Sequence, residues 1–321
     1  MPTVSVTGAT GFVGWHVCET FRDAGWSVRA IVRPANQKPT AAGIDIRPAA
    51  LVPATSSLEE ALAGSDVVVH AAGLVRSLRA ADFQAVNVGG TQAVVNAANA
   101  VDASVLLISS QAAIGTGTVA RPSQEDDLPR PFTAYGRSKL SAEDAVRHDA
   151  RRPWTIVRPP AVYGPRDTAF LPLFRMASRG WFLRLTDGAF PFSLVHVRDL
   201  ARAIVLVASR VESAGQTFFI AQPAPVTADA WLEHLAQAFD RVYRPWRVPG
   251  ALVNLAASAG QIAWMFGIAP PLDRTRLAEF GAEGFVCTTD RVKRVLGFST
   301  EIPMAVGVAE TARWYRAQGW L

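Results

Sequence analysis

The sequence contains only two cysteines, Cys18 and Cys287. Two cysteines do not make a disulfide framework, so a reducing cytoplasm is the expected location. The N-terminus lacks a basic region followed by an apolar stretch, so we expect no secretory signal. The chain also lacks internal repeats and low-complexity linkers. Its 321 residues can therefore form one large domain, or a nucleotide-binding domain with a smaller partner.

Charge is scarce as well. Charged residues make up 18% of the chain and hydrophobic residues 50%, which excludes extensive disorder and allows a sizeable core. The net charge is +5, but there is no dense run of Lys or Arg and no nucleic-acid-binding motif. We therefore expect no nucleic-acid partner, and we interpret the basic balance as that of a protein with an anionic cofactor.

One stretch has no charge at all, from Val248 to Leu272. Its length could cross a bilayer. However, Asn254, Ser258 and Gln261 interrupt it near one helical face, and glycines and a Pro-Pro pair interrupt it further. We predict a buried or pocket-lining helix here. Contact with a membrane surface is the second interpretation, and a membrane span is the third.

The first half of the chain alternates short apolar, β-branched runs with helical patterns. The predicted strands are 3–7, 27–32, 66–70, 104–108 and 154–157, and the predicted helices are 12–22, 57–62, 90–100 and 135–146. Gly25 stands where a helix C-cap is expected. Alternation at this spacing predicts an α/β protein with a doubly wound parallel sheet, the Rossmann fold.

After Pro159 this alternation stops, and Pro, Trp and Phe become denser. Residues 195–197 and 217–220 are predicted to be strands that return to the sheet. We therefore predict a dinucleotide-binding domain over 1–165, with 194–222 returning to it. Residues 166–193 and 223–321 are predicted to form a smaller, mainly C-terminal substrate-binding domain.

A glycine-rich turn follows the first predicted strand, with Gly8, Gly11 and Gly14 three residues apart. Gly8 allows a tight turn, Gly11 allows the backbone to approach a pyrophosphate, and Gly14 lets the helix pack on the strand. The following helix directs free N–H groups and a positive dipole end at the phosphates. The predicted cofactor residues in this loop are Gly8, Thr10, Gly11, Phe12, Val13 and Gly14.

The end of the second predicted strand lacks the acidic residue that NAD-preferring sites use for the ribose hydroxyls. The segment continues instead with Arg33-Pro34. Arg33 is suited to the 2′-phosphate of NADP through charge-assisted hydrogen bonds, and Lys38 could assist it. We therefore expect NADP rather than NAD; the alternative for Arg33 is a solvated surface arginine.

The candidate catalytic residues are Ser110, Tyr135 and Lys139. Tyr135 and Lys139 are four residues apart and share one face of a helix. A nearby ammonium favours the tyrosinate and so makes a tyrosine a better acid or base near neutral pH. Lys139 can also reach the nicotinamide ribose. Ser110 follows a predicted strand and can orient the reacting carbonyl oxygen, with Ser109 as the alternative.

Together these motifs resemble the extended short-chain dehydrogenase/reductases over residues 3 to about 220. The segments that carry the resemblance are Thr7–Gly14, Asp66–Gly73, Asn87–Thr91, Ser109-Ser110, Tyr135–Lys139, Arg158–Pro165 and His196–Asp199. The resemblance implies that Ala71, Ala72 and Gly73 line the nicotinamide, that Pro159 to Val162 contact the carboxamide, and that Asn87 shapes the centre of the sheet. It also implies a structural role for His70 and a homodimer.

Two departures separate the chain from the sugar-nucleotide epimerases that it resembles. Ala161 stands where they usually carry Asn, and Phe192 stands where they tend to carry Arg. Both changes remove groups suited to a diphosphate. The same region is rich in large apolar residues, which suit either a core or an apolar pocket. These are Phe170, Leu171, Phe174, Trp181, Phe182, Phe190, Phe192, Trp264, Met265 and Phe266.

The sequence thus predicts an oxidoreductase closest to the 3β-hydroxysteroid dehydrogenase and dihydroflavonol reductase branch. It would transfer a hydride between NADP(H) and an apolar ketone or secondary alcohol, steroid-like or aromatic, with no metal. The first alternative is a nucleotide-sugar epimerase or dehydratase. The second is a non-catalytic NADP-binding sensor.

Overall fold

The structure is a computed structural model that describes residues 1–34, 41–52, 57–184, 190–265 and 284–321, the side chains of 261–265 excepted. Its centre is a seven-stranded parallel sheet with strand order β11-β6-β5-β4-β1-β2-β3. The strands are β1 (Thr3–Thr7), β2 (Ser27–Val32), β3 (Asp45–Pro48), β4 (Val67–His70), β5 (Ser104–Ile108), β6 (Trp154–Arg158) and β11 (Gln216–Phe219). Apart from β3 they are largely buried, as a sheet covered on both faces requires.

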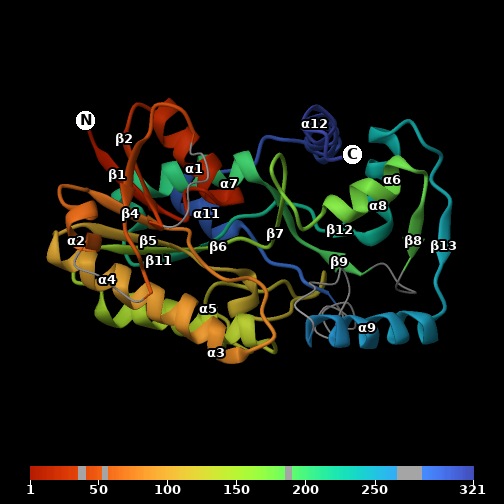
Figure 1. Cartoon of the computed structure of the whole chain (residues 1–321), viewed down its shortest axis with the longest axis horizontal. Coiled ribbons are helices and arrows are strands. Elements are labelled where there is room, and N and C mark those ends of the chain that lie inside the picture. The colour runs from red at the N-terminus through yellow and green to blue at the C-terminus, as the bar shows by residue number, and fades with distance from the viewer. Residues whose placement is uncertain (35–40, 53–56, 185–189, 266–283) are drawn as a thin grey trace.

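Helices cover both faces of this sheet (Figure 1). On one face α1 (Phe12–Asp23) packs against α7 (Val197–Ala208), with Phe21, Leu200 and Ile204 in the core. On the other face lie α2 (Ser57–Leu62), α4 (Gly90–Ala100) and α5 (Ala134–Asp149), which contribute Leu62, Val94 and Val146. The short α3 (Ala80–Phe83) and a π-helical turn (Gln84–Gly89) lead into α4.

The winding of the sheet reverses between β1 and β4, which are neighbours. From β1 the chain continues to β2 and β3 on one side, and from β4 it continues to β5 and β6 on the other. In open α/β sheets a ligand binds at such a reversal, outside the carboxyl ends of the strands. This places the segments after β1, β4 and β5 around one crevice, and confirms the predicted Rossmann fold.

One predicted strand is placed differently. β11 joins the sheet beside β6, as the pattern over 217–220 predicts. The prediction for 195–197 is wrong, because β10 (Leu194–His196) pairs with β7 (Ala161–Tyr163) in a separate two-stranded sheet. Pro159 and Pro160 have no N–H to donate to a ladder, so the chain leaves the large sheet at the end of β6 and β10 follows the departing segment.

Most of the other elements form a second group around their own core: α6 (Leu171–Ser178), β8 (Phe182–Arg184), β9 (Pro191–Phe192), β12 (Val226–Thr227), α8 (Ala228–Ala238) and α12 (Met304–Ala317). β13 (Pro245–Arg247) pairs with β8 and leads to α9 (Gly250–Met265). In contrast, α11 (Asp290–Leu296) packs on the first core through Val292, and the 3₁₀ turns Gln111–Ala113 and Val211–Ser213 lie beside α5 and β11. The rings of Phe174, Trp231 and Tyr315 meet between α6, α8 and α12. The exact division into two domains stays a prediction.

The large apolar residues of this region divide into core and surface. Leu171, Phe174 and Phe182 are buried, whereas Trp181 is 64% exposed. The side chains of Trp264 and Met265, and the whole of Phe266, lie outside the described residues. Most of the apolar residues whose positions are described therefore support the second core and do not line an open pocket.

The uncharged stretch forms α9, but the prediction of a buried helix is wrong for one of its faces. Val253 and Ala257 are buried, while Leu252 and Leu255 are 54% and 66% exposed. Over 250–260, where the side chains are described, only one side of the helix is buried, because the absence of charge does not itself supply a packing partner. Residues 266–272 lie outside the described residues. Within the described ranges, no helix is long and apolar enough to cross a membrane.

Candidate active site

The glycine loop connects β1 to α1 at the carboxyl end of the sheet. Gly8 has a φ of +71°, and a Cβ there would lie 2.7 Å from the backbone nitrogen of Ala72, after β4. A Cβ on Gly14 would lie 2.2 Å from the carbonyl oxygen of Gly8, so only glycine allows α1 to start this close to β1. These two contacts give Gly8 and Gly14 the turn and packing roles predicted from their spacing.

Gly11 is the N-cap residue of α1, and no side chain caps the helix there. Its own N–H donates to the carbonyl of Gly8 at 2.9 Å, and it is exposed, with Phe12 and Val13 half-buried beside it. A helix start without a side-chain cap can offer its first N–H groups to an anion. The loop therefore fits the pyrophosphate of a dinucleotide, with Thr10 to Val13 as the residues that would hold it.

The neighbouring strand β4 ends in a buried polar contact. His70 lies between Thr7 Oγ1, at 2.7 Å from Nδ1, and Thr91 Oγ1, at 3.1 Å from Nε2. Burial, aided by the charge of Lys139, lowers the pKa of His70 to about 3, so the ring is neutral. This is the structural role expected for His70. It joins β1, β4 and α4, and holds the end of β4 from which Ala71, Ala72 and Gly73 continue.

Arg33 follows β2 at the same edge of the sheet. Thr7, the last residue of β1 before the glycine loop, pairs with Ile31 of β2. Arg33 therefore lies two residues beyond the level at which the glycine loop begins. Its side chain is exposed, and no carboxylate follows β2 in the described segment to residue 34. A site that holds a 2′-phosphate would need a cation in this place. Lys38 lies outside the described residues.

The helix that carries the other candidates, α5, begins at Thr133. The Thr133 hydroxyl caps the helix by accepting a hydrogen bond from the N–H of Gly136 at 2.9 Å. Tyr135 is half-buried in the first turn, with its ring 6.1 Å from that of Phe83. Lys139 follows one turn later on the same face and is buried.

Gly136 brings this helix against the loop that carries Ser110. A Cβ on Gly136 would lie 2.3 Å from the carbonyl oxygen of Ala112. Ser110 is two residues before Ala112, and its hydroxyl accepts the N–H of Ala112 at 3.1 Å. Tyr135 precedes Gly136 and Ser110 is two residues before Ala112, so both candidates lie near this contact between α5 and the turn after β5. The tertiary structure brings the predicted catalytic elements together.

Lys139 is buried at the end of β5. Its Nζ donates to the carbonyl of Ile108 at 2.8 Å. Burial lowers the pKa of Lys139 from 10.5 to about 8, while the charge of Glu143 acts in the opposite direction. A Cβ on Gly73 would lie 3.6 Å from this ammonium. The segment predicted to line the nicotinamide and the predicted catalytic lysine therefore meet.

Asn87 ties these two segments together, and sequence reasoning assigned it only a general place in the sheet. Its Oδ1 accepts the N–H of Leu74 at 2.7 Å, and its Nδ2 donates to the carbonyl of Leu74 and to Ser138 Oγ. It lies in the π-helical turn before α4, a form of helix often found at functional sites. Asn87 thus fixes the position of Gly73-Leu74 relative to α5.

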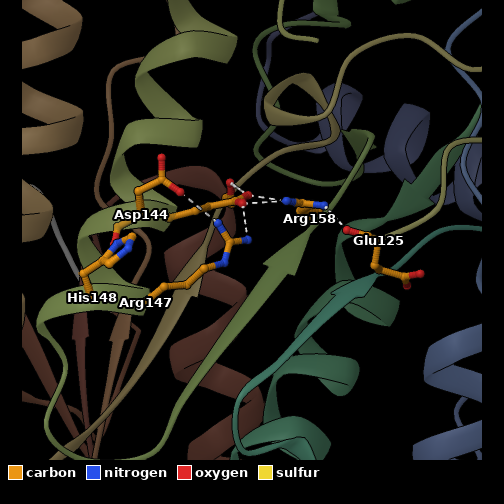
Figure 2. Close-up of polar contacts among 7 residues, drawn as sticks. Glu125, Asp144, Arg147, His148 and Arg158 are labelled. Carbon is orange, nitrogen blue, oxygen red and sulfur yellow. Dashed lines mark hydrogen bonds and ion pairs between the residues drawn. The ribbon is translucent and has the colours of Figure 1, made fainter. Parts of the chain in front are cut away.

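A buried ion-pair network holds α5 one turn beyond Lys139 (Figure 2). The carboxylate of Glu143, fully buried, accepts two hydrogen bonds from Arg158 at 2.6 and 2.9 Å, one from Arg147 at 2.7 Å and one from Ser109 at 2.6 Å. Burial alone would raise the pKa of Glu143, but Arg158 and its other partners hold that pKa below the usual value. Arg158 also donates to the carbonyl of Glu125 at 3.0 Å.

The sequence patterns did not predict this network, although Glu143 lies in the predicted helix 135–146 and Arg158 begins the segment Arg158–Pro165. Glu143 is one turn beyond Lys139 on α5, and Arg158 is the last residue of β6, before Pro159. Ser109, the alternative to Ser110, donates its hydroxyl to Glu143 and is therefore engaged away from the reacting centre. This geometry favours Ser110 over Ser109 as the residue that faces a substrate.

Gln111 was also missed. Its side chain is fully buried, yet neither amide atom has a hydrogen-bond partner. Its backbone N–H donates to the carbonyl of Pro159 at 2.9 Å, which connects the turn after β5 to the end of β6. Val162, in β7, is half-buried beyond this point. Pro159 thus lies beside the turn that carries Ser110. The contact of Pro159 and Val162 with the nicotinamide carboxamide stays a prediction.

The described residues contain no group of three His, Cys, Asp or Glu side chains that could hold a metal ion. The segments that meet at the crevice carry a hydroxyl, a phenol and a lysine, those of Ser110, Tyr135 and Lys139. Together with the glycine loop, this set suits a dinucleotide and proton transfer.

Residues 4–221 match the model of the NAD dependent epimerase/dehydratase family. The chain belongs to this family. The match confirms the resemblance on which the site was predicted, and it identifies the chain as one of a family of nicotinamide-dependent enzymes.

Curated relatives are similar over almost the whole chain. A ceramide reductase from Caulobacter vibrioides is 30% identical, over 99% of this chain and 96% of its own length. A 4-hydroxy-2-methyl-3-oxo-4-farnesyl-3,4-dihydroquinoline-1-oxide ketoreductase from Stigmatella aurantiaca is 30% identical, over 94% and 93%. The human 3 beta-hydroxysteroid dehydrogenase type 7 is 27% identical, over 80% and 78%.

Solved structures share the fold. The structure of gox2253 has a TM-score of 0.81 at 23% identity and covers 100% of both chains. MoeE5 in complex with UDP-glucuronic acid and NAD has a TM-score of 0.78 at 24% identity and covers 98% of this chain and 99% of its own. At this identity the likeness shows the fold alone, and the reaction has to be argued from the site.

Proposed function

We propose that this protein reduces an apolar ketone to a secondary alcohol, or oxidises the alcohol, with NADP(H) as the hydride carrier. The observation that carries the proposal is the contact of α5 with the turn after β5, made through Gly136 and Ala112. This contact brings the segment of Ser110 to the helix of Tyr135 and Lys139. A proton donor, a buried cation and a carbonyl-orienting hydroxyl then occupy the crevice where the dinucleotide loop ends.

Each of the three residues has a separate task. Ser110 donates a hydrogen bond to the substrate oxygen and holds it beside Tyr135. Tyr135 gives its hydroxyl proton to that oxygen during reduction and takes it back during oxidation. Lys139 favours the charged form of Tyr135 by its nearby ammonium and binds the ribose of the cofactor. When bound, NADPH would supply the hydride that reaches the carbonyl carbon.

The cofactor preference rests on Arg33. An exposed guanidinium beyond β2, in a segment whose sequence from 33 to 44 contains no Asp or Glu, supports NADP over NAD. The substrate class rests on the departures at Ala161 and Phe192, which leave no diphosphate-binding group at those positions, and on the relatives. One relative is named for ceramide, one for a farnesylated quinoline and one for a steroid. An extended lipid-like ketone is therefore the substrate class to test.

The experiment follows reduced-nicotinamide absorbance with NADPH and a panel of steroid, aromatic, long-chain and small ketones. Tyr135→Phe should lower turnover by about 10²- to 10⁴-fold and leave cofactor binding intact. Thr133→Ser, which keeps the cap beside it, is the control. Full activity of Tyr135→Phe would disprove the proposed mechanism.

A second arm tests the cofactor. Arg33→Ser should raise the KM for NADPH about tenfold or more, because a charge-assisted hydrogen bond is lost, and leave the KM for NADH unchanged. Faster turnover with NADH in the unaltered protein would overturn the cofactor preference and leave the reaction class standing. Turnover of a nucleotide sugar but of no ketone would favour an epimerase.

A further inference from the structure

Two segments form a surface that the proposed reaction does not use. β8 and β13 pair as a two-stranded parallel ribbon in which Leu183 is the partner of Trp246. Paired residues point to the same face of a sheet. Phe182, on the opposite face, is buried against the ring of Tyr243. Leu183 and Trp246 therefore face outward together, and Figure 1 shows the ribbon at one end of the molecule.

Large apolar side chains gather on and beside this outer face. Trp181 and Trp246 are 64% and 74% exposed, and they are the only strongly exposed tryptophans among the described side chains. Leu252 and Leu255 are exposed on α9, which begins three residues after β13. A soluble surface normally scatters such residues singly, so a gathering of this kind marks an interaction site.

The charge of the same segments has one sign. Residues 171–184 and 241–265 contain six arginines and not one Asp or Glu: Arg175, Arg179, Arg184, Arg241, Arg244 and Arg247. Arg184 is paired with Asp229 from outside these segments. Arg179 and Arg244 are exposed, and Arg241 donates to the carbonyl of Ser178 beside Arg179. Arg179 and Arg244 are each two residues before an exposed tryptophan, Trp181 and Trp246.

We infer that this face, made of the β8–β13 ribbon and the first turns of α9, docks on the surface of an anionic phospholipid bilayer. Tryptophan rings are favoured at the level of lipid headgroups, and arginines there can keep their guanidiniums on phosphates while their stems lie on apolar surface. Leu252 and Leu255 would enter the acyl boundary. The positive face complements the negative charge of the lipid. The helix lies on the bilayer and does not cross it.

This inference adds a membrane partner to the proposed function. It does not depend on which substrate the protein accepts. The experiment is co-sedimentation of the full chain with vesicles of phosphatidylcholine alone or mixed with phosphatidylglycerol. Binding should be strong on the mixed vesicles, weak on phosphatidylcholine, and reduced by salt. Equal partition to both vesicles, or none to either, would overturn the inference.

Matched variants locate the binding face. The double variant Trp181→Ser/Trp246→Ser should lower partition to mixed vesicles by about tenfold or more, because apolar burial is lost. Leu128→Ser, at a side chain 74% exposed outside this face, is the control and should bind as the unaltered protein does. Arg244→Gln should lower partition about fivefold, and the exposed Arg151→Gln should not.

A second copy of the chain is the competing occupant. If sedimentation equilibrium without lipid shows a dimer that the Trp181→Ser/Trp246→Ser variant loses, the face is a self-interface and the membrane inference fails. Reduction of a water-soluble ketone without vesicles reports separately on the proposed function. That rate should be the same in all of these variants, because none of them alters a residue of the crevice.

Discussion

α5 and α9 are both 16 residues long, yet they use charge in opposite ways. α5 contains six Lys, Arg, Asp and Glu residues, and it buries two of them, Lys139 and Glu143. α9 contains none, and it exposes Leu252 and Leu255. Hydropathy alone would place the first helix on the surface and the second in the core.

The difference shows that a side chain is buried where the folded chain supplies it with partners, whatever its hydropathy. Lys139 has a backbone carbonyl and Glu143 has two arginines and a serine, so each charge keeps hydrogen bonds that replace water. Over the described side chains of α9, Val253 and Ala257 are buried on one face, whereas Leu252 and Leu255 on the other remain exposed.

Glu143→Gln should destabilise the protein by about 3–5 kcal/mol, because the buried guanidinium of Arg158 would lose its countercharge. The matched control is the next residue. Asp144→Asn removes a carboxylate that is 52% exposed and touches only Arg147, and should cost at most about 1 kcal/mol. Urea denaturation measures both free energies of unfolding. Equal losses would mean that the network does not hold α5.

Gly136→Ala and Gly250→Ala compare the two helices at their starts. A Cβ on Gly136 would meet the carbonyl of Ala112, whereas one on Gly250 would meet nothing within 4 Å. Gly136→Ala should cost about 1–3 kcal/mol of stability and lower kcat about a hundredfold, since Tyr135 would move from Ser110. Gly250→Ala should leave both quantities unchanged or raise stability slightly. Normal kcat in Gly136→Ala would contradict the proposed role of this contact.

The pKa of Lys139 predicts a smaller, pH-dependent effect. Its folded value of about 8 is below the ordinary 10.5, so burial of the charge costs stability at neutral pH. Between these two values the unfolded chain keeps a proton that the folded chain has lost, and stability rises with pH. Cys18 and Cys287, whose burial raises their pKa to about 12, act in the opposite direction above about 9.

The measurement therefore compares the free energy of unfolding of the unaltered protein with that of a variant without the Lys139 ammonium. The free energy of unfolding of the unaltered protein minus that of Lys139→Met should increase from neutral pH to about pH 10. Both cysteines are present in both proteins and cancel. A constant difference would show that Lys139 keeps its ordinary pKa in the folded state.

The smallest effect is expected on the exposed face of α9. Leu255→Asn should change stability by less than about 0.5 kcal/mol, because the side chain is already 66% exposed. Val253→Asn, on the buried face at 3% exposure, should cost about 2–3 kcal/mol. Thermal unfolding separates the two. If Leu255→Asn is as damaging as Val253→Asn, the face is covered and the membrane inference loses its basis.

Much of the fold and of the site was accessible from the sequence because the signals are local. The predicted strands 3–7, 27–32 and 104–108 match the bounds of β1, β2 and β5. The spacing of the three glycines predicts the turn and the close packing that Gly8 and Gly14 show. Tyr135 and Lys139 lie on one helix, so their common face follows from helical geometry alone.

The parts that sequence reasoning missed depend on contacts between distant segments. Arg158 and Glu143 are 15 residues apart, and only the packing of α5 against β6 makes them a pair. Asn87 meets Leu74 and Ser138 through the same kind of packing. The pattern of Leu194–His196 predicts a strand that returns to the large sheet. It pairs instead with β7, because the chain leaves the large sheet at Pro159-Pro160.

By itself the sequence determined most strands and helices up to residue 157, the glycine turn after β1 and the candidate residues of the reacting centre, because period, spacing and conformational preference are properties of short segments. Only the tertiary structure decided that Gly136 sets α5 against the turn of Ser110, that Glu143 is buried with two arginines, and that α9 leaves its leucines and the neighbouring tryptophans exposed. Which groups are desolvated depends on the surfaces that the folded chain brings together, and no local pattern records that.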